Sequence, residues 1–177
     1  IPGSTPNVPE TGQQLVEIRN PQPVQVNFGN CFKECNECPS GSVLGTNLIA
    51  NGNFEGTSLP VSDYPYFTPG PGMPVGSHSV MTATEVTTAN PQWACTNHTP
   101  GGQKMMVVDG INSGSNVAWK SNGAIAVQPN NNYVFCAYFN NLVRKNLNYA
   151  DAQVSIWINS VQVGSTVTLP ENPDIWL

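Results

Sequence analysis

Polar and hydrophobic residues alternate over short stretches along most of the chain. A period of two is typical of β-strands with one buried face, and turn pairs such as Asn122-Gly123 separate the stretches. No stretch keeps a sustained helical period, and the best helical candidate, 140–151, is weak. The pattern predicts strands within 48–50, 79–86, 104–108, 117–127, 133–139, 154–158, 161–163 and 167–169.

The strand stretches recur at spacings near ten residues between 46 and 177. Short strands at this spacing are typical of a β-sandwich or jelly roll. The Pro- and Gly-rich stretch 60–76 interrupts them and carries Tyr64, Tyr66 and Phe67, which predicts a long ordered loop or flap. We therefore expect an all-β domain over 46–177.

Residues 1–30 differ from the rest and predict an extended Pro-rich arm or linker. Five prolines disfavour a helix, yet Leu15–Ile18 and Val24–Phe28 alternate. These two stretches are interpreted as edge strands or as segments that lie on a neighbouring molecule, and a disordered linker is the alternative. Residues 31–45 form a Cys-containing junction.

Composition narrows the function classes. The chain has 177 residues and a net charge of -5, with 11 acidic and six basic side chains. The scattered bases lack the footprint of a nucleic-acid-binding protein, and no apolar run is long enough to span a bilayer. The chain begins at Ile1 without a signal segment and stops after the strand-like Asp174–Trp176, so we expect a processed piece of a longer product.

Five cysteines are the disulfide candidates of an exported protein, in which low Lys content and Asn/Thr/Gly-rich sequence are common. Zinc is the alternative for the first three, but no fourth ligand lies at a usual spacing. A Cys95–Cys136 pair is one possibility, and an odd count leaves one thiol free, buried or bonded to another chain. The candidates are Cys31, Cys35, Cys38, Cys95 and Cys136.

Catalysis is not expected. The chain lacks the common motifs of nucleophilic, metallopeptidase and phosphate-binding sites. Cys95 and His98 lie three residues apart, but a disulfide beside a structural histidine explains them better than a thiol–imidazole pair.

Calcium is the metal that the sequence favours, because carboxylates and loop carbonyls supply the oxygen ligands it prefers. Glu55 follows Asn51-Gly52-Asn53, and Asp109 ends a strand in a turn pair. These two are the candidate ligands of one structural calcium ion; a solvated Glu55 and a turn-forming Asp109 are the alternatives.

Carbohydrate binding is the function that the aromatic residues favour. Exposed aromatic faces stack on sugar rings, and amide, imidazole and guanidinium groups bind hydroxyls. Core packing is the competing interpretation for Trp157 and also for Trp93. The predicted carbohydrate contacts are Tyr66, Trp93, His98 and Arg144, all in expected loops.

Five segments in order resemble a known group of domains. Asn47–Glu55 is similar to the "N-L-x-x-N-G-x-F-E" opening of galactose-binding-like jelly rolls, which include carbohydrate-binding modules. The segments 93–99, 102–110 and 117–119, then Asn159–Gly164, resemble repeated domains of large secreted bacterial surface proteins of gliding or adhesive cells.

The resemblance implies a jelly roll with a structural calcium ion bound by Glu55, and further strands beyond Leu177. A roll that lacks strands exposes an open edge, so either the chain continues or a neighbouring molecule supplies a strand. The stretches Leu15–Ile18 and Val24–Phe28 suit such a donor.

Two functions are therefore expected. The first is a non-catalytic extracellular or cell-surface module that binds a glycan or mediates adhesion. The alternative is a structural subunit of an extracellular fibre or sheath, in which copies of the chain polymerise by strand exchange through the N-terminal arm.

Overall fold

The computed structural model describes three backbone segments of the N-terminal region and most of the chain from residue 47 onward. The described residues are 13–14, 16–19, 24–27, 47–98, 101–111, 116–128, 133, 135, 137–147, 149–173 and 175–177. Their structure is mostly β, as the sequence predicts. The strands are β1 (Gln13–Gln14), β2 (Val16–Arg19), β3 (Val24–Asn27), β4 (Ser77–Thr82), β5 (Lys104–Asp109), β6 (Val117–Lys120), β7 (Ile125–Ala126), β8 (Tyr138–Asn140), β9 (Ala152–Ile158) and β10 (Val161–Leu169), with one helix, α1 (Ala83–Ala89).

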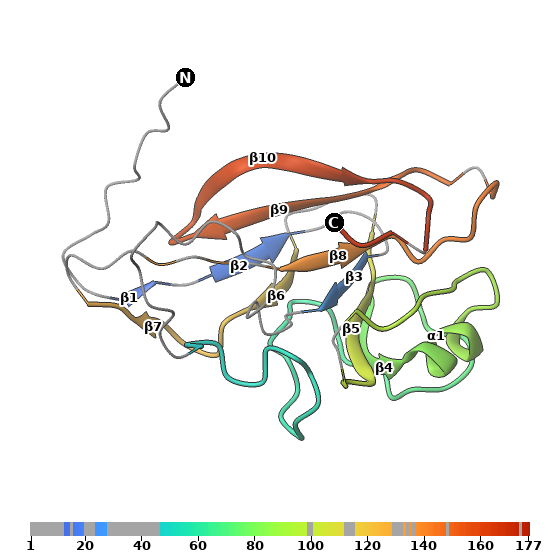
Figure 1. The fold of residues 1–177 in the computed structure, drawn as a ribbon, viewed down its shortest axis with the longest axis horizontal. Helices are drawn as coiled ribbons and strands as arrows, with labels where there is room; N and C mark the ends of the chain where they lie inside the picture. The colour runs from blue at the N-terminus through green and yellow to red at the C-terminus, as the bar shows by residue number, and fades with distance from the viewer. Residues whose placement is uncertain are drawn as a thin grey trace.

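Two four-stranded antiparallel sheets form the body of the described structure (Figure 1). One has the order β10-β9-β2-β6 and the other the order β4-β5-β3-β8. A separate short pair joins β1 to β7. The core between the sheets contains Met106 and Val108 of one sheet together with Trp119, Val154 and Leu169 of the other. Side chains of both sheets therefore share one apolar layer.

A second apolar cluster covers the outer face of the β4-β5-β3-β8 sheet. Met105 and Val107 of β5 point to this side and contact the cluster that contains Val86 of α1. Because β5 is buried on both faces, its sequence is a continuous apolar run rather than an alternating one. The helix thus adds a third layer to the two sheets.

The N-terminal strands are interior rather than edge strands. β2 lies between β9 and β6, and β3 lies between β5 and β8. The period of two was recognised correctly, but the edge position expected for both stretches was wrong. Leu15 and Phe28, which belong to the predicted stretches, lie outside the described residues.

Helix α1 occupies residues for which the sequence predicts a strand. A strand was expected through Val86, but β4 ends at Thr82, which caps α1. The Thr82 side chain accepts the Glu85 N–H, and the Glu85 carboxylate accepts the Thr82 N–H at 2.8 Å. This capping box has the signature Thr-x-x-Glu, which is visible in the sequence. The described residues of 140–151 contain no helix, and 48–50 form a turn instead of a strand.

The turn between the predicted strands 154–158 and 161–163 and the predicted loop 60–76 are both present in the structure. Asn159 and Ser160 both have positive φ (48° and 64°), as the two central residues of a type I′ turn require, and they join β9 to β10. The stretch 60–76 is a long loop with two isolated bridges, at Val61 and at Tyr66. Leu177 and Phe139 of β8 exchange two backbone hydrogen bonds of 2.9 Å, so Leu177 lies beside β8.

Candidate functional site

A short extended segment after α1 runs antiparallel to the chain that leaves β8. The Arg144 N–H donates to the Gln92 carbonyl at 2.9 Å, and Trp93 forms a bridge with Val143. Opposite residues of an antiparallel pair project to the same face, and neighbours along the strand alternate. Trp93 and Val143 therefore share one face, while Gln92 and Arg144 share the other.

The two residue pairs differ in exposure. Trp93 is 3% exposed and Val143 4%, and both pack in the cluster with Met105. Gln92 and Arg144 are exposed. The prediction that Trp93 contacts carbohydrate is therefore wrong, because its indole is buried in the core and cannot reach a sugar ring.

Tyr149 lies against the exposed face of this pair. Its hydroxyl donates to Gln92 Oε1 at 3.0 Å, its backbone N–H donates to Glu171 Oε1 at 2.9 Å, and its side chain is 51% exposed. Among the described residues, the Arg144 guanidinium has no hydrogen-bond or ion-pair partner. We call Gln92, Arg144, Tyr149 and Glu171 the Tyr149 surface.

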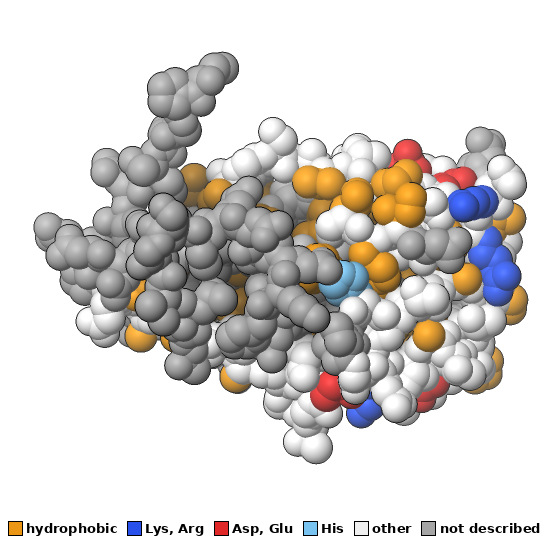
Figure 2. Space-filling model, viewed as in Figure 1, with side chains coloured by type: hydrophobic (Ala, Val, Ile, Leu, Met, Phe, Trp, Pro, Cys, Tyr) orange, Lys and Arg blue, Asp and Glu red, His pale blue; other side chains and the backbone are white. Residues whose placement is uncertain are grey.

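The Tyr149 surface combines an aromatic ring, whose hydroxyl is hydrogen-bonded, with polar groups that have no partner among the residues the structure describes. Gln92 Nε2 can still donate, the Arg144 guanidinium can donate several hydrogen bonds, and the second oxygen of Glu171 can accept. Figure 2 shows basic and acidic side chains together at the right-hand end of this face, where the chain after β8 lies in Figure 1. Of these four residues, only Arg144 was predicted from the sequence.

His98 belongs to a separate aromatic cluster at the other end of β8. Its ring stacks on Tyr138 with a centroid distance of 3.9 Å and an interplanar angle of 23°, and Trp176 packs at 5.3 Å. Tyr138 precedes Arg144 by six residues, about 20 Å along an extended chain. His98 and Arg144 therefore lie along one edge but not in one site.

Tyr66 lies at the opposite edge of the same sheet. It is 39% exposed, and its ring packs edge-on against His78 of β4 at a centroid distance of 5.4 Å. Three strand spacings, about 14 Å, separate β4 from β8. The structure therefore does not bring the four predicted carbohydrate residues together.

His78 is buried and accounts for the position of the loop before β4. Its Nδ1 lies 2.6 Å from the Tyr64 carbonyl, which can only accept, so Nδ1 carries the proton. Its Nε2 is buried and has no hydrogen-bond partner among the described residues. Burial lowers the pKa of His78 below its usual value, and the bond to Tyr64 offsets part of this effect.

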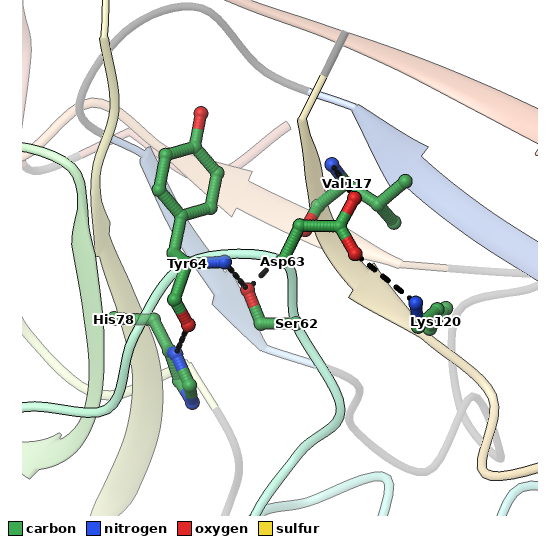
Figure 3. A network of polar contacts seen from close by, with 6 residues as sticks. All are labelled: Ser62, Asp63, Tyr64, His78, Val117 and Lys120. Atoms are coloured by element: carbon green, nitrogen blue, oxygen red, sulfur yellow. Dashed lines mark hydrogen bonds and ion pairs between the residues drawn. The ribbon is translucent and has the colours of Figure 1, made fainter.

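The same loop contacts β6, as Figure 3 shows. Asp63 Oδ2 accepts the Val117 N–H at 3.0 Å, and Asp63 Oδ1 lies 3.0 Å from Lys120 Nζ. The loop thus joins β4 of one sheet to β6 of the other. The Asp63–Lys120 pair is partly exposed, so it contributes little to stability beyond its part in holding the loop against β6.

The two predicted calcium ligands occupy opposite ends of β5. Glu55 Oε1 accepts the N–H groups of Gln103 at 2.5 Å and Lys104 at 2.7 Å, where the strand begins. Asp109 ends the strand, about 17 Å further along. They do not form one site, and in the described part of the chain no three His, Cys, Asp or Glu side chains gather as metal ligands do. A structural calcium ion stays a prediction.

Asp109 is nonetheless unusual because it is a carboxylic acid that is only 6% exposed. Burial raises its pKa to about 6, since the charged form loses hydration. Its charge also contributes to the raised pKa of Tyr64, for which burial is the main cause.

Cys95 is a free thiol, so the disulfide predicted for it is absent from this structure. Its sulfur lies 3.5 Å from the Met105 sulfur at the edge of the apolar cluster, and burial raises its pKa to about 12. A thiol with this pKa is a poor nucleophile at neutral pH. Cys31, Cys35, Cys38 and Cys136 lie outside the described residues.

A pocket of about 370 Å³ lies beside β6 and β7, away from the Tyr149 surface. Its wall includes Leu59, Trp119, Asn122 and Ile125. None of the predicted carbohydrate or metal residues lines it.

Comparisons with known proteins leave the family open: no family model, no curated protein and no solved structure matches this chain. Among the described residues, no helix has the length and apolarity needed to cross a membrane.

Proposed function

We propose that this protein is a non-catalytic extracellular module, a β-sandwich of jelly-roll type, which binds carbohydrate or mediates adhesion through the Tyr149 surface. The observation that carries the proposal is the exposed Tyr149 ring, whose hydroxyl is hydrogen-bonded to Gln92. Gln92 lies opposite Arg144, whose guanidinium has no partner within the described part of the chain.

The chemistry of this surface fits a sugar better than an apolar ligand. The Tyr149 ring offers a flat face for the C–H groups of a pyranose. Gln92 Nε2 and Arg144 donate to hydroxyl oxygens, and Glu171 accepts from hydroxyl groups. A guanidinium also binds a carboxylate through two parallel hydrogen bonds, so Arg144 favours a sugar that carries an acidic group.

The surface is open, so one copy binds weakly. We expect a dissociation constant of about 0.1–1 mM for a single sugar, because few contacts offset the loss of translational and rotational freedom. Several copies on one surface would strengthen attachment through their high effective concentration. This behaviour suits adhesion rather than capture of a soluble ligand.

Glycan-array screening of the purified protein, followed by calorimetry on the hits, tests the proposal. Tyr149→Ala and Arg144→Gln should weaken binding, whereas Tyr66→Ala, which alters an exposed tyrosine at the far edge of the sheet, should not. Binding that is insensitive to both changes at the Tyr149 surface would refute the site. Absence of binding to neutral and acidic glycans alike would refute the function.

A second candidate function is supported by a different observation: β2 and β3, from the first 30 residues, occupy interior positions of both sheets. A strand that completes a sheet within its own chain can complete the same sheet in another copy. Through such exchange the chain would serve as a structural subunit of an extracellular fibre or sheath.

Native mass spectrometry of the full chain, with the denatured mass from the same sample, tests strand exchange. A ladder of multimers, together with mixed species after incubation of labelled and unlabelled protein, is expected if strands exchange. A monomer at every concentration would exclude this second function and leave carbohydrate binding untouched.

A further inference from the structure

β10 is a long edge strand with exposed side chains on both faces. It is the outermost strand of its sheet, and within the described structure only β9 pairs with it. Residues 161–168 are exposed and only Leu169 is buried. In Figure 1 the strand runs along the upper margin of the molecule. Its outer N–H and C=O groups can therefore pair with another strand.

The usual protections of an edge strand are largely missing here. Natural edges carry Lys, Pro, inward-pointing charges or a β-bulge, each of which hinders pairing with other chains. The sequence of β10, Val-Gln-Val-Gly-Ser-Thr-Val-Thr-Leu, contains no charged residue and no proline. One irregularity is present, a register shift between Val163 and Val167.

The shift is an ordered feature that divides β10 into two regular arms. Gly164 has φ +73°, and the Gln162 amide donates to the Gly164 carbonyl at 3.2 Å and to Thr166 Oγ1 at 3.4 Å. The arms 161–163 and 167–169 on either side keep a regular antiparallel register with β9. Ser165 is the midpoint between them.

Each arm presents valines on the same face of the sheet. Val163 is opposite Ile156 and Val167 is opposite Val154, two positions apart on β9. Opposite residues share a face, so both valines lie on one side. Val161, Val163 and Val167 are 62%, 38% and 43% exposed, so an apolar row follows the free edge.

We propose that β10 pairs antiparallel with β10 of a second copy of this chain, about a two-fold axis through Ser165. In this register Val163 lies opposite the partner's Val167, and Gln162 lies opposite the partner's Thr168. Apolar residues meet apolar residues and polar residues meet polar residues in both arms. The two sheets then form one continuous sheet.

The strand itself favours a second copy over a different partner. A two-fold contact brings each residue type close to itself, so any charge near the axis would repel its equivalent. β10 has none over nine residues. In this register odd-numbered residues lie opposite odd-numbered residues, and even-numbered residues lie opposite even-numbered ones. The outward backbone N–H and C=O groups of one copy therefore face those of the other copy, as an antiparallel ladder requires. A charged peptide would find no complementary charge on this strand.

The inference is independent of the carbohydrate proposal and of strand exchange. It uses the outer edge of one sheet, whereas β2 and β3 fill the interior of both sheets. Pairing through β10 would make a bivalent particle with two Tyr149 surfaces.

Sedimentation velocity of the full chain over a concentration series, with charge variants at the axis, tests the contact. Ser165→Lys places two ammonium groups, and Ser165→Glu two carboxylates, opposite one another. Each variant alone should dimerise about 100-fold more weakly than the wild type, because juxtaposed like charges cost several kcal/mol. Mixing the two variants should restore a dimer that contains one copy of each.

The control is the same pair of changes at Thr68, an exposed residue in the loop before β4. Thr68→Lys and Thr68→Glu should dimerise as the wild type does, and far-UV circular dichroism should show that all four variants are folded. A wild type that is monomeric at every concentration would overturn the proposal. Equal dimerisation of the Ser165→Lys variant, or failure of the mixture to form a mixed dimer, would overturn it as well.

Discussion

The Tyr149 hydroxyl donates a 3.0 Å hydrogen bond to Gln92 Oε1 across a sequence separation of 57 residues. This contact fixes the orientation of an exposed ring, which would otherwise lose rotational freedom when a ligand stacks on it. The pairing of Gln92 with Arg144 then adds a guanidinium to the same face. The exposed Gln92, Arg144 and Tyr149 and the half-buried Glu171 thus bring three parts of the chain to one surface.

Two substitutions at Tyr149 separate the ring from its hydroxyl. Tyr149→Ala should weaken carbohydrate binding about 10-fold, because it removes the stacking face. Tyr149→Phe should keep most of the affinity but release Gln92, at a cost in folding stability below about 1 kcal/mol. Calorimetric titration and urea denaturation of both variants provide the test. Equal affinity of the alanine variant and the wild type would show that the ring takes no part.

The Glu55 carboxylate is expected to stabilise the start of β5. Its Oε1 accepts two backbone N–H groups, and hydrogen bonds to a charged acceptor are stronger than neutral ones. Glu55→Ala should therefore destabilise the fold by about 1–3 kcal/mol, measured by urea denaturation. Glu55→Gln should cost less, because the amide oxygen can still accept.

Calcium and a chelator distinguish the two roles of Glu55. A loss of stability that is the same in both conditions indicates a backbone contact alone. If Glu55→Ala lowers stability only when calcium is present, Glu55 is a calcium ligand, as the resemblance to galactose-binding-like domains implies.

The capping box gives a local prediction for α1. Thr82→Ala removes an acceptor for the Glu85 N–H and should lower stability by about 1 kcal/mol. Thr87→Ala, an exposed change within the same helix, should be neutral or slightly stabilising, because alanine has the higher helix propensity. Thermal unfolding of the two variants compares them directly, and an equal loss would argue against the cap.

The sequence predicts most strands of this structure but not their neighbours. The alternation at Val24–Phe28 is the same for an edge strand and an interior strand, because period two reports which side chains share a face and not what pairs with the backbone. The apolar run of β5 was identified because burial on both faces leaves a continuous signal. Helix α1 was missed although its capping box is in the sequence, since a helix of only seven residues directly after a strand is too short to show a helical period.

The candidate site was less predictable. Trp93 and Gln92 are adjacent, and only the pairing with Val143 and Arg144 decides which of them is buried. The contribution of Tyr149 depends on a contact between distant segments, which no local pattern contains.

The buried carboxyl of Asp109 predicts a pH dependence of stability. Its pKa is about 6 in the folded protein against 3.8 for an ordinary aspartate. Between these values the folded state binds more protons at this site than the unfolded state, so its contribution to stability falls as pH rises. His78 acts in the opposite direction, because its lowered folded pKa makes stability fall as pH drops below about 6.5.

Comparison of Asp109→Asn with the wild type isolates the carboxyl. The asparagine variant should gain stability relative to the wild type between about pH 4 and pH 7, since it lacks the titrating group while His78 is common to both. Urea denaturation at four or more pH values measures this difference, and Asp151→Asn, at an exposed aspartate, is the matched control. A difference that is constant with pH would mean that Asp109 is charged in the folded protein throughout this range, and that its burial is compensated by contacts that favour the anion.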